Sequence, residues 1–145
     1  MATLLSDVRW LRVLVAVMAT HVANVVLSVG LVVAYSLLAI GPQGDPDGGS
    51  VDRFASVFST WLIPVLTLVA AIWAARGTRP VMAVWHGLAV GVLVAGIFGL
   101  LFFWPNDLQS LALFVLTVAA GFVGGVIRKT LGEGRTKPEQ SRSEA

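Results

Sequence analysis

The sequence contains no cysteine, and only 12% of its 145 residues are charged. The absence of cysteine excludes disulfides, thiolate metal sites, haem attachment through cysteine and lipid anchors on cysteine. A soluble domain usually carries about twice this share of charged residues. Because 57% of the residues are also apolar and gathered into long runs, the composition predicts an integral membrane protein embedded in a lipid bilayer.

The interiors of the apolar runs contain no Asp, Glu, Lys or Arg. Ion-coupled transporters and pumps usually need an acid or a base at that depth. The sequence also has no nucleophile–base constellation, metal-ligand spacing or phosphate-binding loop. It has no basic stripe with aromatic residues that would bind nucleic acid. We therefore expect no enzyme activity, no metal, no cofactor and no nucleic-acid partner.

The sequence does contain four long apolar segments, each of helical length. Short polar connections between them favour sequential neighbours that run in opposite directions. The first segment is too long for a cleaved signal peptide, so we expect it to be retained as a helix. The predicted fold is all-α, a four-helix antiparallel transmembrane bundle with short loops. The expected bounds are one domain over 1–131 with helices at about 10–40, 52–75, 80–104 and 107–129, followed by a disordered cytoplasmic tail over 132–145.

The basic residues predict the orientation of these four spans. In a four-span topology, nine of the ten Lys and Arg residues fall on one side, and only Arg53 falls on the other. Cytoplasmic loops carry the excess of Lys and Arg in membrane proteins. The distribution therefore predicts a multi-pass protein of the inner or plasma membrane, with its N- and C-termini in the cytoplasm.

Small residues recur every fourth position along the third predicted helix, and a shorter series lies on the fourth. Such spacing lines one face of a helix and lets another backbone approach closely. Two interpretations remain open: the two faces pack against each other within one chain, or the longer face binds another protomer or another protein. The residues are Ala83, Gly87, Gly91, Ala95 and Gly99 on the third helix, and Gly121 and Gly125 on the fourth.

A second pattern is a polar stripe along the first predicted helix, formed by His21, Asn24, Ser28 and Tyr35. Their spacings of three, four and seven place them on one face. The second helix offers a matching series of hydroxyls at Ser56, Thr60 and Thr67. Polar groups at this depth should face protein or water because hydrocarbon cannot satisfy them. The stripe therefore predicts interhelical hydrogen bonds, a hydrated path or ligand pocket, or contact with a partner.

His21 and His86 are the only histidines in the chain. Residue counting along the first and third helices places them at roughly similar depth in the cytoplasmic half. We expect each histidine to hydrogen-bond to a neighbouring helix. Two facing imidazoles could instead ligate a haem iron or form part of a proton path.

Two functions from different classes follow from these patterns. The leading hypothesis is a non-catalytic accessory or assembly subunit of a membrane complex, or a homo-oligomer, that packs through its small-residue faces. The alternative is a passive channel or small-solute binding protein lined by the polar stripe. A haem-binding electron-transfer subunit that uses both histidines is a more distant third hypothesis.

Overall fold

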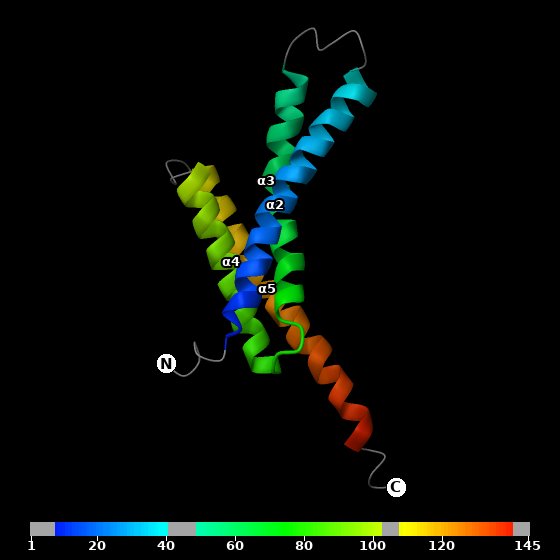
Figure 1. The fold of residues 1–145 in the computed structure, drawn as a ribbon, viewed down its shortest axis with the longest axis vertical. Coiled ribbons are helices and arrows are strands. Elements are labelled where there is room, and N and C mark those ends of the chain that lie inside the picture. Colours follow the sequence, from blue (N-terminus) through cyan, green and yellow to red (C-terminus); the bar gives the residue numbers. More distant parts are fainter. Residues whose placement is uncertain (1–7, 41–48, 103–107, 141–145) are drawn as a thin grey trace.

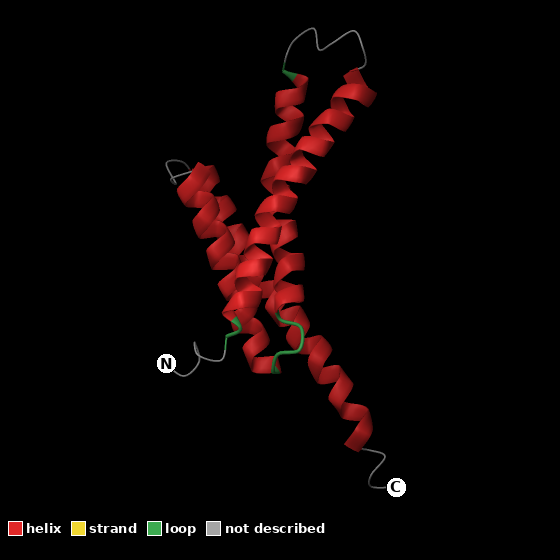
Figure 2. Cartoon of the chain, in the orientation of Figure 1, coloured by secondary structure: helices red, strands yellow, loops and turns green. Residues whose placement is uncertain are grey.

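The computed structural model describes residues 8–40, 49–102 and 108–140, and every element in these ranges is a helix (Figures 1 and 2). Four of the helices are long and apolar enough to cross a membrane, which indicates a multi-pass membrane protein. The expectation of an all-helical chain with four such segments is confirmed. The elements are α2 (Trp10–Tyr35), a single π-helical turn η1 (Ser36–Ile40), α3 (Ser50–Ala74), α4 (Pro80–Phe102) and α5 (Leu108–Gln140).

The connection between α3 and α4 shows how local chemistry sets the helix bounds. Gly77 adopts a φ of 69°, a left-handed conformation that ends α3 and that glycine accepts without strain. Pro80 is the first residue of α4, where its missing N–H costs nothing. The guanidinium of Arg12 donates a 2.7 Å hydrogen bond to the carbonyl oxygen of Arg76. This bond fastens the start of α2 to the turn.

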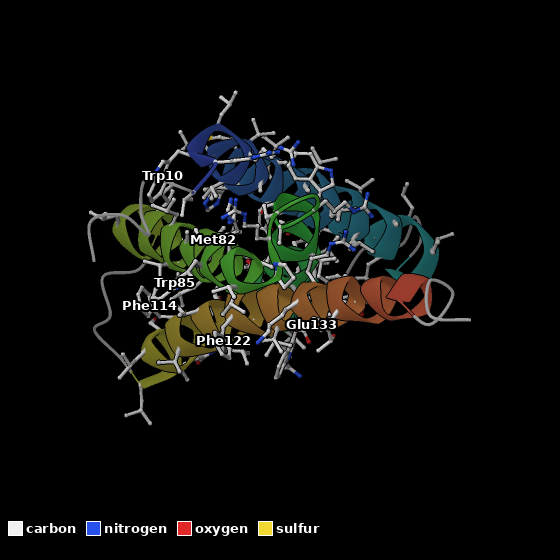
Figure 3. All side chains as sticks on the ribbon, turned by 90° about the horizontal axis from the view of Figure 1, so that it is seen from below. Trp10, Met82, Trp85, Phe114, Phe122 and Glu133 are labelled. Atoms are coloured by element: carbon white, nitrogen blue, oxygen red, sulfur yellow. The ribbon has the colours of Figure 1, made fainter. Side chains whose placement is uncertain are left out.

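The helices form two hairpins, α2 with α3 and α4 with α5, that cross and then diverge (Figure 1). We call the end where α2 and α4 begin the terminal end, and the opposite end the distal end. Seen along the long axis, α2 and α5 lie at opposite edges of the molecule with α3 and α4 between them (Figure 3). The closest packing is between α4 and α5, while α3 contacts all three other helices.

The buried core is concentrated where the hairpins cross and toward the terminal end. Val13 and Val17 of α2 pack there with Val90 and Val94 of α4, and all four are almost fully buried. Apolar residues nearer the distal end, such as Val29 of α2, are largely exposed. The molecule is therefore a packed bundle at one end and an open wedge at the other.

The last helix, α5, extends beyond the bundle, and the prediction of a disordered cytoplasmic tail over 132–145 stays a prediction. The helix continues to Gln140, and it projects past the other helices (Figure 1). Lys129 and Glu133 also form an ion pair at 4.0 Å. The predicted loops over 41–48 and 103–107, and the last residues 141–145, lie outside the described residues.

Candidate functional site

The backbones of α4 and α5 touch through glycines on both helices. A Cβ added at Gly121 would lie 2.6 Å from the carbonyl oxygen of Gly87 and 2.6 Å from the Cα of Gly91. A Cβ at Gly125 would lie 2.7 Å from the carbonyl oxygen of Ala83. Real Cβ atoms do not approach backbone this closely, so these positions hold the helices at a separation that only glycine permits.

The series of small residues on α4 does not stay in contact along its whole length. Ala95 is buried, but a Cβ added at Gly99 would meet only the ring of Phe114, at 4.0 Å. Gly124, which is not among the predicted packing positions, faces α3: a Cβ there would lie 2.8 Å from the carbonyl oxygen of Leu68. In the sequence, only its position beside Gly125 indicated that Gly124 could also pack closely against another helix. Another protein could reach the Gly87–Gly91 face only if α4 and α5 separated.

His86 is fully buried and joins α4 to the start of α2. Its Nε2 accepts a 3.0 Å hydrogen bond from the backbone N–H of Arg9, the residue that precedes α2. Its Nδ1 lies 2.8 Å from the carbonyl oxygen of Met82. Because a carbonyl only accepts, Nδ1 carries the proton and Nε2 does not, which is the neutral tautomer. Both ring nitrogens are therefore engaged within the chain.

The two histidines do not lie at a similar depth, which corrects the expectation from residue counting. His86 lies at the level of Arg9, and His21 follows twelve residues later on α2. At about 1.5 Å per residue, His21 is roughly 18 Å further along the helix. The count failed because α2 begins beside the second turn of α4 and not beside its first residue. This separation leaves no shared axial site for a haem iron.

The polar stripe of α2 begins where this helix leaves α4. The row of buried residues Val13, Val17 and Thr20 continues along the same face to Asn24 and Ser28. Three buried side-chain atoms on this stripe have no hydrogen-bond partner among the described residues: His21 Nε2, Asn24 Oδ1 and Ser28 Oγ. A buried polar atom without a partner costs about 1–3 kcal/mol. The stripe is therefore costly in the isolated chain.

The hydroxyls of α3 do not satisfy this stripe, although the sequence suggested a match. Thr60 donates to the carbonyl oxygen of Ser56 at 2.7 Å, and Thr67 donates to that of Ile63 at 2.8 Å. Each hydroxyl thus bonds to its own helix. Tyr35, at the end of the stripe, stacks on Phe54 of α3 with ring centroids 4.3 Å apart. The only aromatic member of the stripe thus contacts α3 by its ring.

A groove runs between the distal parts of α3 and α5 and has a volume of about 380 Å³. Polar and apolar side chains share its walls. The residues that line it are Ser56, Val57, Thr60 and Trp61 of α3 and Gln109, Ala112, Leu113 and Leu116 of α5.

Compared with known proteins, the chain matches no protein-family model, no curated protein and no solved structure. Among the described residues, no group of three or more His, Cys, Asp and Glu side chains is placed to hold a metal ion. The arguments for function therefore rest on the glycine contacts, the stripe and the groove.

Proposed function

We propose that the chain is an antiparallel four-helix bundle in the inner or plasma membrane, with both termini in the cytoplasm. Nine of its ten basic residues belong to the terminal end in this topology. Arg12 and Arg76 meet there through the hydrogen bond between their guanidinium and carbonyl groups. An excess of Lys and Arg at one end favours the cytoplasmic side for that end.

Within this topology, we propose that the protein is a non-catalytic interaction subunit that binds a transmembrane helix of another protein or of a second copy. The supporting observation is the stripe of three buried polar atoms without partners on α2. Hydrocarbon offers these atoms no hydrogen bond, whereas a neighbouring helix with polar side chains does. The stripe lies at the opening of the wedge, where α4 has moved away from α2 (Figure 1).

The proposed contact differs from one made through the small-residue faces. Gly87, Gly91, Gly121 and Gly125 already hold α4 and α5 together. A partner that used this face would have to replace α5. The three stripe atoms are also buried, but they lack hydrogen bonds within the chain. A partner helix that displaces the side chains covering them would supply those bonds without replacing a whole helix, so the stripe is the better candidate for binding.

Purification in mild detergent, followed by mass spectrometry of the intact particle, tests this proposal. The expected particle is larger than one protomer and contains a second membrane protein or a second copy. Replacing Asn24 by Leu together with Ser28 by Ala should disperse it. The matched control, Val25→Ala on the exposed face of the same helix, should leave it intact. A wild-type protein that is purely monomeric under these conditions would contradict the proposal.

The sequence also raised a passive conduit for a small solute, and the same three atoms would line it. Reconstituted vesicles distinguish the two functions. Flux of a small polar solute above that of empty vesicles, abolished by Asn24→Leu, would favour the conduit. Absence of flux together with a stable complex would favour the interaction subunit.

A further inference from the structure

The groove between α3 and α5 combines hydrogen-bond donors with an apolar floor. The indole of Trp61 and the amide of Gln109 make no hydrogen bond with any described residue. The indole N–H only donates, and the amide nitrogen carries two further donors. Leu113 and Leu116 continue the wall toward the terminal end. The walls therefore suit a ligand with acceptor oxygens at one end and hydrocarbon at the other.

The length of the groove fits one leaflet of a bilayer. Gln109 to Leu116 spans eight residues of α5, and the seven steps between them give about 10 Å of rise. One leaflet contributes about 15 Å of hydrocarbon. The volume of about 380 Å³ lies within the ~300–1,000 Å³ range of small-molecule sites. Along α5 the polar Gln109 stands near the distal mouth and the apolar Ala112, Leu113 and Leu116 lie deeper, in the order of a lipid's ester region and acyl chain.

Arg53 carries a positive charge one helical turn outward from the groove along α3. It precedes Val57 by four residues and Ser56 by three, so it lies one turn outward on the groove-lining face of α3. It is the only Lys or Arg between Arg12 and Arg76, and none lies between Arg79 and Arg128. The Arg53 side chain is exposed and forms no ion pair with any described residue.

We infer that this groove binds one anionic glycerophospholipid, with its phosphate at Arg53, its ester oxygens at Gln109 and Trp61, and an acyl chain along Leu113 and Leu116. A guanidinium is the side chain best suited to a phosphate. This placement gives a role to the one basic residue that departs from the charge asymmetry of the chain. The inference rests on insertion in a bilayer but not on the partner proposed for α2.

Tryptophan fluorescence in vesicles of the purified chain tests the inference. Trp10, Trp73, Trp85 and Trp104 are replaced by Phe so that Trp61 is the only emitter. Phosphatidylcholine vesicles then receive equal small fractions of brominated phosphatidylglycerol or brominated phosphatidylcholine, which quench a tryptophan that they contact. One basic residue at an anionic lipid should favour the anionic quencher by a factor of about five.

Variants separate the groove from general lipid contact. Arg53→Gln should reduce the preference to about one, whereas Arg53→Lys should keep most of it. Ala112→Phe, which fills the groove, should also abolish the preference while the helical circular dichroism stays unchanged. The control is a chain whose single tryptophan is placed by Val115→Trp, at the same depth of α5 but outside the groove lining. It should show no preference.

Three results would overturn the inference. The first is equal quenching of Trp61 by the two lipids. The second is a preference that survives Arg53→Gln. The third is protection of Trp61 from both quenchers while the tryptophan at position 115 is quenched, because the groove would then hold a protein segment and not a lipid.

Discussion

The terminal and distal halves of the bundle are built from the same apolar helices but differ in packing. In the terminal half, glycines on α4 meet glycines on α5, and every polar atom of the His86 ring has a partner. In the distal half, Gly99 meets only the edge of Phe114, and a Cβ at Gly96 would contact nothing within 4 Å. Polar atoms on α2 there lack partners. Close approach therefore requires small residues on both helices, and a ridge on one helix alone does not bring a neighbour near.

The largest effect is expected from filling the glycine contact of the terminal half. A Cβ at Gly87 would overlap the carbonyl oxygen of Gly121 and lie 2.7 Å from the nitrogen of Gly125. Because backbone atoms cannot move aside cheaply, Gly87→Ala should lower the free energy of unfolding by about 1–3 kcal/mol, and Gly87→Ile by more. Unfolding in mixed detergent, followed by circular dichroism, measures this change.

Gly96→Ala on the same helix is the matched control, since its new methyl group would contact nothing within 4 Å. It should be neutral or slightly stabilising, because alanine favours helix over glycine. Equal losses in the two variants would show that helix propensity, and not contact between α4 and α5, governs stability.

The next largest loss of stability is expected at His86, whose ring nitrogens are paired in the terminal half. His86→Leu leaves the N–H of Arg9 and the carbonyl oxygen of Met82 without their ring partner. The loss of stability should be about 1–3 kcal/mol. Amide hydrogen exchange should also speed up at the first turn of α2. Unchanged exchange at Arg9 and Trp10 would contradict the role of His86 in holding α2.

In the distal half, where the polar atoms of α2 have no partner, a polar-to-apolar substitution should change stability in the opposite direction. Asn24→Leu removes a buried unsatisfied oxygen, so the purified single chain should keep its stability or gain up to ~1 kcal/mol. The same unfolding assay as for His86 measures the change. A clear loss of stability would mean that Asn24 is already satisfied within the chain, and the proposed partner contact would lose its basis.

The sequence was informative where a single segment decides the structure. Apolar run lengths located the four helices, and Pro80 marked the start of α4. It was less informative where two segments meet. The bond from Arg9 to His86 joins residues 77 positions apart, and its existence depends on how α2 crosses α4. The hydroxyls of Thr60 and Thr67 looked like partners for α2, but back-bonding to their own helix competes with any neighbour.

The smallest change in the free energy of unfolding is expected where α5 leaves the bundle. A substitution there tests whether the extension of α5 stabilises either half. A Cβ at Gly132 would still meet Pro80 at 3.9 Å, the last contact of this kind along α5 among the described glycines. The Lys129–Glu133 pair is largely exposed and has the less favourable order, with lysine first. Lys129→Ala should therefore change the free energy of unfolding by only about 0.2–0.5 kcal/mol. The same unfolding assay measures this change, and added salt should produce a change of similar size in the wild type by screening the pair. A loss near that of Gly87→Ala would mean that the α5 extension supports the terminal half, and that the core extends beyond the crossing of the hairpins.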